Sequence, residues 1–142
     1  DGERMKARML NDAIALSDIP LAELTAVGSV AESLIERDVT DELLRETTIQ
    51  YLFHARTVFY SSIMLQVLTS DEKYGLFARA MSQLLGFFIE INNRPNGREI
   101  LTTNLDALKQ IEHMLLEIPL IDNLTLTGAE KLLEVSGNLT VG

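Results

Sequence analysis

One apolar stretch, residues 51–88, constrains the fold of this chain more than any other part of it. All five phenylalanines and all three tyrosines of the 142-residue sequence fall inside it, and it is split into two segments once, by the polar run at 69–72. Aromatic side chains bury a large apolar area each, so a stable fold has to be organised around the two segments flanking that interruption. A connection this short predicts two antiparallel helices, a helical hairpin.

The residues before the hairpin form a first predicted segment, 1–38. It is expected to hold two helices, 2–17 and 21–37, because apolar residues recur in both with helical spacing. Asp18-Ile19-Pro20 separates them, since proline disfavours the helical conformation in the residue before it.

The hairpin itself opens the second predicted segment, 39–118. Its first arm is expected at about 40–68, with Thr40 as the N-cap. Its second arm is expected at about 71–91, and residues 69–72 have the pattern of a capping box in front of it.

A fifth helix, about 98–117, is predicted after the hairpin, and the tail, 119–142, is the third segment. The alternation in Asn123-Leu124-Thr125-Leu126-Thr127 is typical of a short strand. Thr127-Gly128-Ala129-Glu130 has the pattern of a second capping box, opening a short helix that Gly137 could end. The alternative is a β-hairpin that turns at Gly137-Asn138. The predicted fold class is therefore all-α, with a short strand and helix in the tail.

The later part of the long first arm, VFYSSIMLQVL, is apolar on nearly every side. Such a helix has to be covered from several directions, and a chain with few long helices has little to cover it with. We therefore expect the chain to be oligomeric through its hairpin, with 39–118 as the oligomerisation core. The predicted interface residues are Tyr51, Phe53, Phe59, Tyr60, Ile63, Phe77, Met81, Phe87 and Phe88.

Patterns that indicate catalysis or metal binding are sparse. The chain has no cysteine, which excludes disulfides, thiolate zinc sites and thiol nucleophiles. His113 and Glu117 are spaced as metal ligands on one helix face can be, but neither Glu-x-x-His nor His-Glu-x-x-His occurs. Phosphate-binding glycine loops and the Gly-x-Ser-x-Gly nucleophile motif are absent as well. We predict no catalytic residue, no cofactor and no metal; a metal-dependent helical enzyme using this pair is a third hypothesis.

The net charge of −9 argues against a surface that binds nucleic acid everywhere. Two local basic groups remain: Arg4, Lys6 and Arg8 near the start, and Arg94 and Arg98 after the hairpin. Two or three cations bind DNA weakly in one copy, but repeated around an oligomer they would form a continuous band. These five residues are the predicted DNA-binding set.

The sequence also suggests where the protein acts. No run of uncharged residues reaches the roughly 18 to 20 needed to cross a bilayer, and the start lacks the apolar core of a signal peptide. A cytoplasmic location, in a host cell if the protein is viral, and no membrane partner are therefore expected. The chain begins without methionine, which suggests a trimmed chain or a fragment.

With these elements laid out, the chain resembles the small terminase subunit of T-even-type bacteriophages. The resemblance rests on short matches in the same order: Leu16-Ser17-Asp18-Ile19-Pro20; Leu43-Leu44-Arg45; Phe77-Ala78 with Met81, Gln83 and Glu90-Ile91; and Asn123-Leu124-Thr125 through Gly128 to Glu130-Lys131-Leu132-Leu133. Residues 92–98 and the helix ending in Leu115 and Leu116 fit that pattern poorly.

The resemblance implies a non-catalytic, homo-oligomeric DNA-packaging adaptor. It would form a ring that engages double-stranded viral DNA and regulates a separate large terminase subunit, which hydrolyses ATP and cuts the DNA. The alternative is a helical assembly factor or adaptor that binds only protein, and the acidic charge of the chain favours that alternative.

Overall fold

The structure is a computed structural model that describes residues 2–142, and over these residues it is built from helices without any strand. The all-α prediction is confirmed, and the predicted strand at 123–127 is wrong. The elements are α1 (Gly2–Leu24), α2 (Val27–Glu36), α3 (Asp41–Thr69), α4 (Glu72–Asn93), α5 (Gly97–Thr103), α6 (Leu105–Leu116), the 3-10 turn η1 (Ile121–Asn123) and α7 (Leu126–Ser136).

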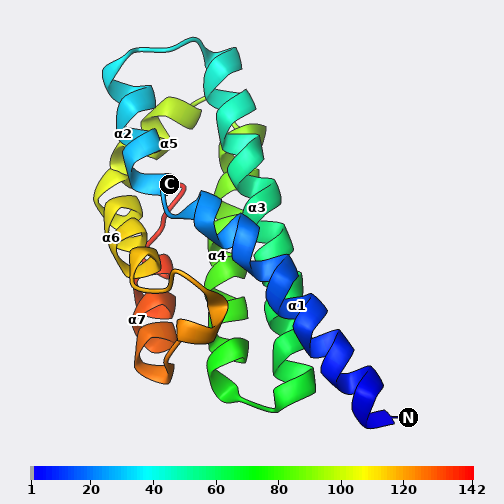
Figure 1. Ribbon diagram of the computed structural model, residues 1–142. Coiled ribbons are helices and arrows are strands. Elements are labelled where there is room, and N and C mark those ends of the chain that lie inside the picture. The colour runs from blue at the N-terminus through cyan, green and yellow to red at the C-terminus, as the bar shows by residue number, and fades with distance from the viewer. Residues whose placement is uncertain (1) are drawn as a thin grey trace.

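Helices α3 and α4 run antiparallel along the full length of the molecule (Figure 1). The hydroxyl of Thr40 accepts a hydrogen bond from the Leu43 N–H and caps α3, as the sequence predicted. Ser70 then takes a left-handed conformation, with φ of 58°, which turns the chain sharply.

The cap of α4 differs from the predicted capping box. Asp71, not Thr69, is the N-cap, and its carboxylate accepts a hydrogen bond from the Lys73 N–H. Thr69 still belongs to α3 and donates its hydroxyl hydrogen to the Leu65 carbonyl oxygen at 2.7 Å. The left-handed residue between them moves the helix start by two positions, and the sequence pattern did not reveal that turn.

Helix α1 crosses α3 diagonally and runs past Pro20, where a helix boundary was predicted (Figure 1). Proline inside a helix costs about 3 kcal/mol because it removes a hydrogen bond and crowds the preceding turn. Leu21 and Leu24, both 0% exposed, hold this end of α1 in the core. Burying a leucine contributes about 2 kcal/mol, so the pair offsets the cost of the proline. The helix breaks only at Thr25-Ala26.

A second layer formed by α2, α5, α6 and α7 covers the other side of the hairpin (Figure 1). The Glu112 carboxylate of α6 accepts hydrogen bonds from both the N–H and the hydroxyl of Ser29 in α2, at 2.8 and 2.9 Å. The predicted fifth helix is in fact two helices, because the chain turns at Asn104. The side chain of Asn104 donates to the Thr140 carbonyl oxygen and accepts from the Thr140 N–H, which ties the C-terminal tail to this turn.

The predicted short helix of the tail is confirmed as α7, which ends at Gly137 as expected, but it begins at Leu126, inside the segment predicted as a strand, and Thr125 rather than Thr127 is its N-cap. Leu124 is buried, and Thr125 caps α7 by accepting a hydrogen bond from the Gly128 N–H at 3.0 Å. The alternative β-hairpin is also wrong, because Val135 lies in α7 and packs into the core.

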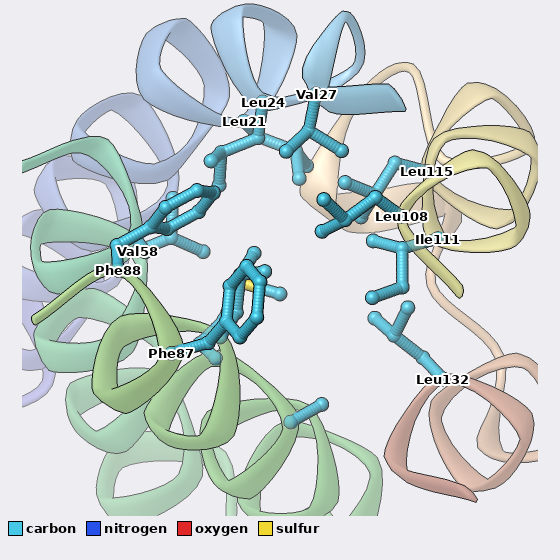
Figure 2. Packing of buried hydrophobic residues seen from close by; sticks show 14 of the residues in the cluster. Leu21, Leu24, Val27, Val58, Phe87, Phe88, Leu108, Ile111, Leu115 and Leu132 are labelled. Carbon is cyan, nitrogen blue, oxygen red and sulfur yellow. The ribbon is translucent and has the colours of Figure 1, made fainter. Parts of the chain in front are cut away.

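A single hydrophobic core takes side chains from all three predicted segments, including Leu21 of α1, Phe88 of α4 and Leu132 of α7 (Figure 2). Four of the predicted interface residues, Phe77, Met81, Phe87 and Phe88, belong to this core and are at most 3% exposed. They cannot contact a second copy of this fold. Helix α1 packs on α3 and α7 packs on α4, so the chain itself covers these residues.

One helical stretch, Gly2–Glu36, which α1 and α2 share, is long and apolar enough by length and composition to span a bilayer. The sequence criterion missed it because it required an uncharged run, whereas this stretch contains an apolar window of 18 residues with no more than two charged side chains. Part of the stretch is buried within the fold, where Leu21, Leu24 and Val27 are core residues. Core helices of this kind pass the same test.

Candidate interaction surface

One side of α3 is apolar and uncovered. Its exposed apolar residues are spaced by four, seven, four and three positions, which places them on one line along the helix. They are Ile49, Phe53, Tyr60, Met64 and Val67, with Tyr60 62% and Val67 72% exposed. The buried residues of the same helix, such as Val58 and Leu65, lie on the opposite side. Arg56 lies within this line, its guanidinium 5.0 Å from the centre of the Phe53 ring.

A second exposed apolar line runs along α1, with Met5, Met9, Leu16 and Ile19 spaced by four, seven and three positions. The two lines adjoin. Leu16 and Ile19 of α1 line the same hollow, of about 270 Å³, as His54 and Thr57 of α3. We call the five exposed apolar residues on α3 and the four on α1 the outer surface. Summed over these residues, the exposed area approaches the roughly 800 Å² that one partner contributes to a standard protein interface.

Of the five remaining predicted interface residues, three lie on or beside this surface, whereas Tyr51 and Phe59 are half-buried against the core. Phe53 and Tyr60 belong to it, and Ile63 is 39% exposed next to it. Phe59 is half-buried with its ring 5.2 Å from that of Tyr60. Tyr51 is half-buried too, its ring 6.0 Å from the core ring of Phe88. The surface therefore combines part of the predicted set with a line on α1 that the sequence analysis missed, although the spacing of its methionines and Leu16 signalled it.

Beyond Phe59 and Ile63, a groove of about 750 Å³ follows the other flank of the hairpin between α3 and α4. Its lining mixes apolar side chains with Gln66, Glu72 and Arg79. No charge of one sign dominates it, and the groove identifies no particular ligand.

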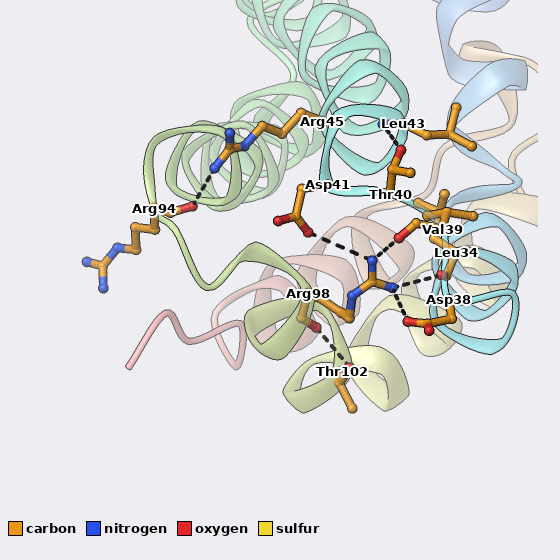
Figure 3. A network of polar contacts seen from close by, with 10 residues as sticks. All are labelled: Leu34, Asp38, Val39, Thr40, Asp41, Leu43, Arg45, Arg94, Arg98 and Thr102. Atoms are coloured by element: carbon orange, nitrogen blue, oxygen red, sulfur yellow. Dashed lines mark hydrogen bonds and ion pairs between the residues drawn. The ribbon is translucent and has the colours of Figure 1, made fainter.

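Arg98, one of the predicted DNA-binding residues, is engaged within the fold (Figure 3). Its guanidinium donates to the carbonyl oxygens of Leu34 and Val39, and it pairs with Asp38 at 3.6 Å and Asp41 at 3.8 Å. These contacts tie the start of α5 to the connection between α2 and α3. Arg98 therefore has a structural role within its own chain, which argues against its assignment to DNA.

Arg94 is also held by its own chain. Its Nε lies 2.7 Å from a carboxylate oxygen of Glu90, and its Nη1 donates to the Val141 carbonyl oxygen at 3.1 Å. An exposed salt bridge is weak, about 0.2 to 1 kcal/mol, but the contact with Val141 gives Arg94 a structural role in fixing the tail.

The other basic group, Arg4, Lys6 and Arg8, lies on the exposed start of α1. Figure 1 places this start at the end of the molecule opposite α5, so the structure does not gather the five predicted residues into one basic patch. Residues 1–12 contain three of the 12 basic and three of the 21 acidic side chains, so residues 13–142 carry the entire net charge of −9.

Residues suited to catalysis are not brought together in the part of the chain that the structure describes. Within residues 2–142, no three His, Asp or Glu side chains lie close enough to share a metal ion. His113 is exposed in the last turn of α6, and Glu117 is exposed just after it. Burial raises the pKa of Tyr51, aided by the charges of Glu23 and Glu112. A hydrogen bond from Lys109 to Glu32, 2.7 Å long, raises the pKa of that lysine.

No protein-family model, curated protein or solved structure matches this chain, so the outer surface and the exposed basic start of α1 are the features from which a function has to be argued.

Proposed function

We propose that this chain is a non-catalytic helical adaptor that works as a homo-oligomer, with the outer surface buried between copies. The observation that carries the proposal is the continuous apolar area formed by α1 and α3. An oligomeric adaptor of this kind needs no reactive side chain; its function is to hold copies, and the partners bound to them, in a fixed arrangement.

The size of the outer surface supports self-association. About 800 Å² per partner is the standard contribution to a stable interface, and removing apolar area from water yields about 25 cal/mol per Å² before the costs of association. The side chains at its centre, Phe53, Tyr60 and Met64, are aromatic or methionine, the types enriched where proteins bind each other.

A second candidate is the DNA-packaging adaptor similar to a small terminase subunit, working with a large ATPase and nuclease subunit. The observation that favours it is the exposed basic group on the first turns of α1, which an oligomer would repeat. Arg94 and Arg98 no longer support it, because both make structural contacts in their own chain. An oligomer that binds only protein therefore agrees better with the geometry.

Sedimentation velocity over a range of protein concentrations tests the proposal. The wild-type protein should sediment as an oligomer, and Tyr60→Asp should shift it towards monomer because a charge replaces an aromatic ring inside the interface. Leu116→Asp, an equally exposed apolar position at the end of α6, is the matched control and should leave the oligomer intact. A wild-type protein that stays monomeric at about 100 µM, a hundredfold above a micromolar Kd, would refute the proposal.

Fluorescence anisotropy with duplex DNA at low and moderate salt separates the two candidates. Salt-sensitive binding that Lys6→Glu with Arg8→Glu abolishes would favour the packaging adaptor. An oligomer that binds no DNA even at low salt would leave the protein-binding adaptor.

A further inference from the structure

The first turns of α1 stand outside the body of the fold. Residues 2–9 are helical and all exposed, and Figure 1 shows this end of α1 projecting past the hairpin beside the lower end of α3. A helical segment this short is marginal in water without tertiary contacts. We call residues 2–9 the arm. It carries apolar side chains, Met5 and Met9, and basic ones that include Lys6 and Arg8.

The position of the arm along α3 follows from the packing of α1. The Ser17 hydroxyl donates to the Ser61 hydroxyl oxygen at 2.7 Å, and Pro20 shares a hollow with Thr57, so the two helices cross in antiparallel directions. From this crossing point α1 runs towards the C-terminal end of α3, and its diagonal course carries the arm to one side of that end (Figure 1). Lys6 and Arg8 therefore lie beside the C-terminal end of α3.

The opposite end of α3 is acidic on the same side as its apolar line. Glu42 and Glu46 are exposed, and they precede Ile49 and Phe53 by the spacings that keep residues on one face of a helix. The exposed line along α3 is thus acidic at its start and apolar from Ile49 to Val67, and the basic arm lies beside its end.

We propose that two copies of this chain pair through their outer surfaces in an antiparallel, two-fold arrangement, in which the arm of each copy binds the acidic start of α3 of the other. The inference rests on the proposed self-association and adds its geometry. A two-fold axis at the middle of the apolar line, level with Val58, puts Thr69 of one copy level with Thr47 of the other. Lys6 and Arg8 then lie beside Glu42 and Glu46 of the second copy.

Charge and symmetry both favour a second copy over other occupants. A two-fold contact brings the same surface together from both sides, so a surface with opposite charges at its two ends matches itself when it is antiparallel. Each copy carries a net charge of −9, which opposes association, and the basic arm offsets that repulsion at the two places where the bodies are closest. The arm would also bury more of Met5 and Met9, which are 66% and 43% exposed in a single copy.

A charge-swap experiment by sedimentation equilibrium at low and moderate salt tests this geometry. Lys6→Glu with Arg8→Glu should raise the dimer Kd about tenfold, because exposed ion pairs contribute little each but the two-fold axis repeats them. Glu42→Lys with Glu46→Lys should do the same, and the four substitutions together should restore the Kd to within about threefold of wild type. Glu130→Lys with Glu134→Lys, the same change at the same spacing on α7, is the control and should not weaken the dimer.

Each outcome is decisive. Restored pairing in the four-fold variant supports the proposal. A wild-type dimer that tolerates both charge reversals, or reversals that the combination does not repair, would overturn the arm geometry and leave the proposed self-association standing. A monomeric wild-type protein would overturn both. Binding of the monomer to vesicles of phosphatidylcholine and phosphatidylglycerol would instead assign the outer surface to a lipid bilayer and also overturn the proposal.

Discussion

Replacing Gly28 with alanine tests how closely the backbones of α2 and α6 pack against each other. Gly28 lies in the first turn of α2 and faces the backbone of α6. A Cβ atom added there would lie 2.7 Å from the Lys109 Cα and 3.0 Å from the Leu108 carbonyl oxygen. Backbone atoms of a helix cannot rotate aside as a side chain can, so α2 and α6 would have to move apart.

The size of the effect follows from two opposing terms. Alanine is favoured over glycine in a helix by at most about 1 kcal/mol, and less near a helix end. Forcing an extra methyl group into a packed contact costs about 1 to 3 kcal/mol. Separating the helices would also stretch the hydrogen bonds between Ser29 and Glu112 and the ion pair between Lys109 and Glu32. We expect Gly28→Ala to lower the free energy of unfolding by about 1 to 2 kcal/mol.

Urea and thermal unfolding at one protein concentration measure this change, with Gly86→Ala as the matched control. Gly86 lies inside α4 with no heavy atom within 4 Å of an added Cβ, so alanine there should raise the free energy of unfolding by about 0.5 to 1 kcal/mol. The two substitutions are chemically identical, yet their Tm shifts should have opposite signs, each about 3 °C per kcal/mol. Two increases of similar size would show that α2 and α6 are not in close contact and refute the reasoning.

Three further substitutions probe other contacts. Arg98→Met should lower the free energy of unfolding by about 2 kcal/mol in urea titrations, because two carbonyl oxygens lose their donor, and an unchanged midpoint would contradict that role. The raised pKa of Tyr51 means that the folded state keeps a proton which the unfolded state releases near pH 10, so stability should fall as pH rises above about 10. Tyr51→Phe should make that alkaline loss smaller, and an equal loss in the variant would count against it. Asn104→Ala should speed hydrogen exchange at the Thr140 amide at least tenfold, since its acceptor is removed, and unchanged protection would show that other contacts hold the tail.

The parts of the fold that the sequence predicted well depend on neighbours in the chain. Thr40 signals the start of α3, because its hydroxyl oxygen accepts a hydrogen bond from the N–H of Leu43, three residues later. The absence of glycine and proline from there to residue 69 keeps that helix unbroken. The parts that it predicted badly depend on distant residues. Pro20 stays in a helix because Leu21 and Leu24 are buried against other helices, and the turn at Asn104 is tied to Thr140.

The candidate interface shows the same limit. The sequence indicated more apolar area than a lone hairpin could cover, but hydrophobic spacing alone does not tell which side of a helix its own chain covers. Phe88 and Tyr60 look alike as aromatic residues of the central stretch, yet one is 2% and the other 62% exposed, because Phe88 of α4 faces the shared core whereas Tyr60 lies on the outer side of α3. The prediction that Arg98 binds DNA has a related weakness, because the sequence did not show that Arg98 pairs with Asp38 and Asp41 in the loop before α3.

The short link between α3 and α4 has a consequence for the order in which the chain folds. Closing a connection of two residues costs little entropy, so these two helices can pair early. Helix α2 has no such local partner. Its contact with α6, through Ser29 and Glu112, joins residues 83 positions apart, so it cannot form until the whole hairpin has been synthesised. During synthesis, α2 is therefore made early but is among the last helices to be secured, and pulse-labelled hydrogen exchange should find α3 and α4 protected before α2.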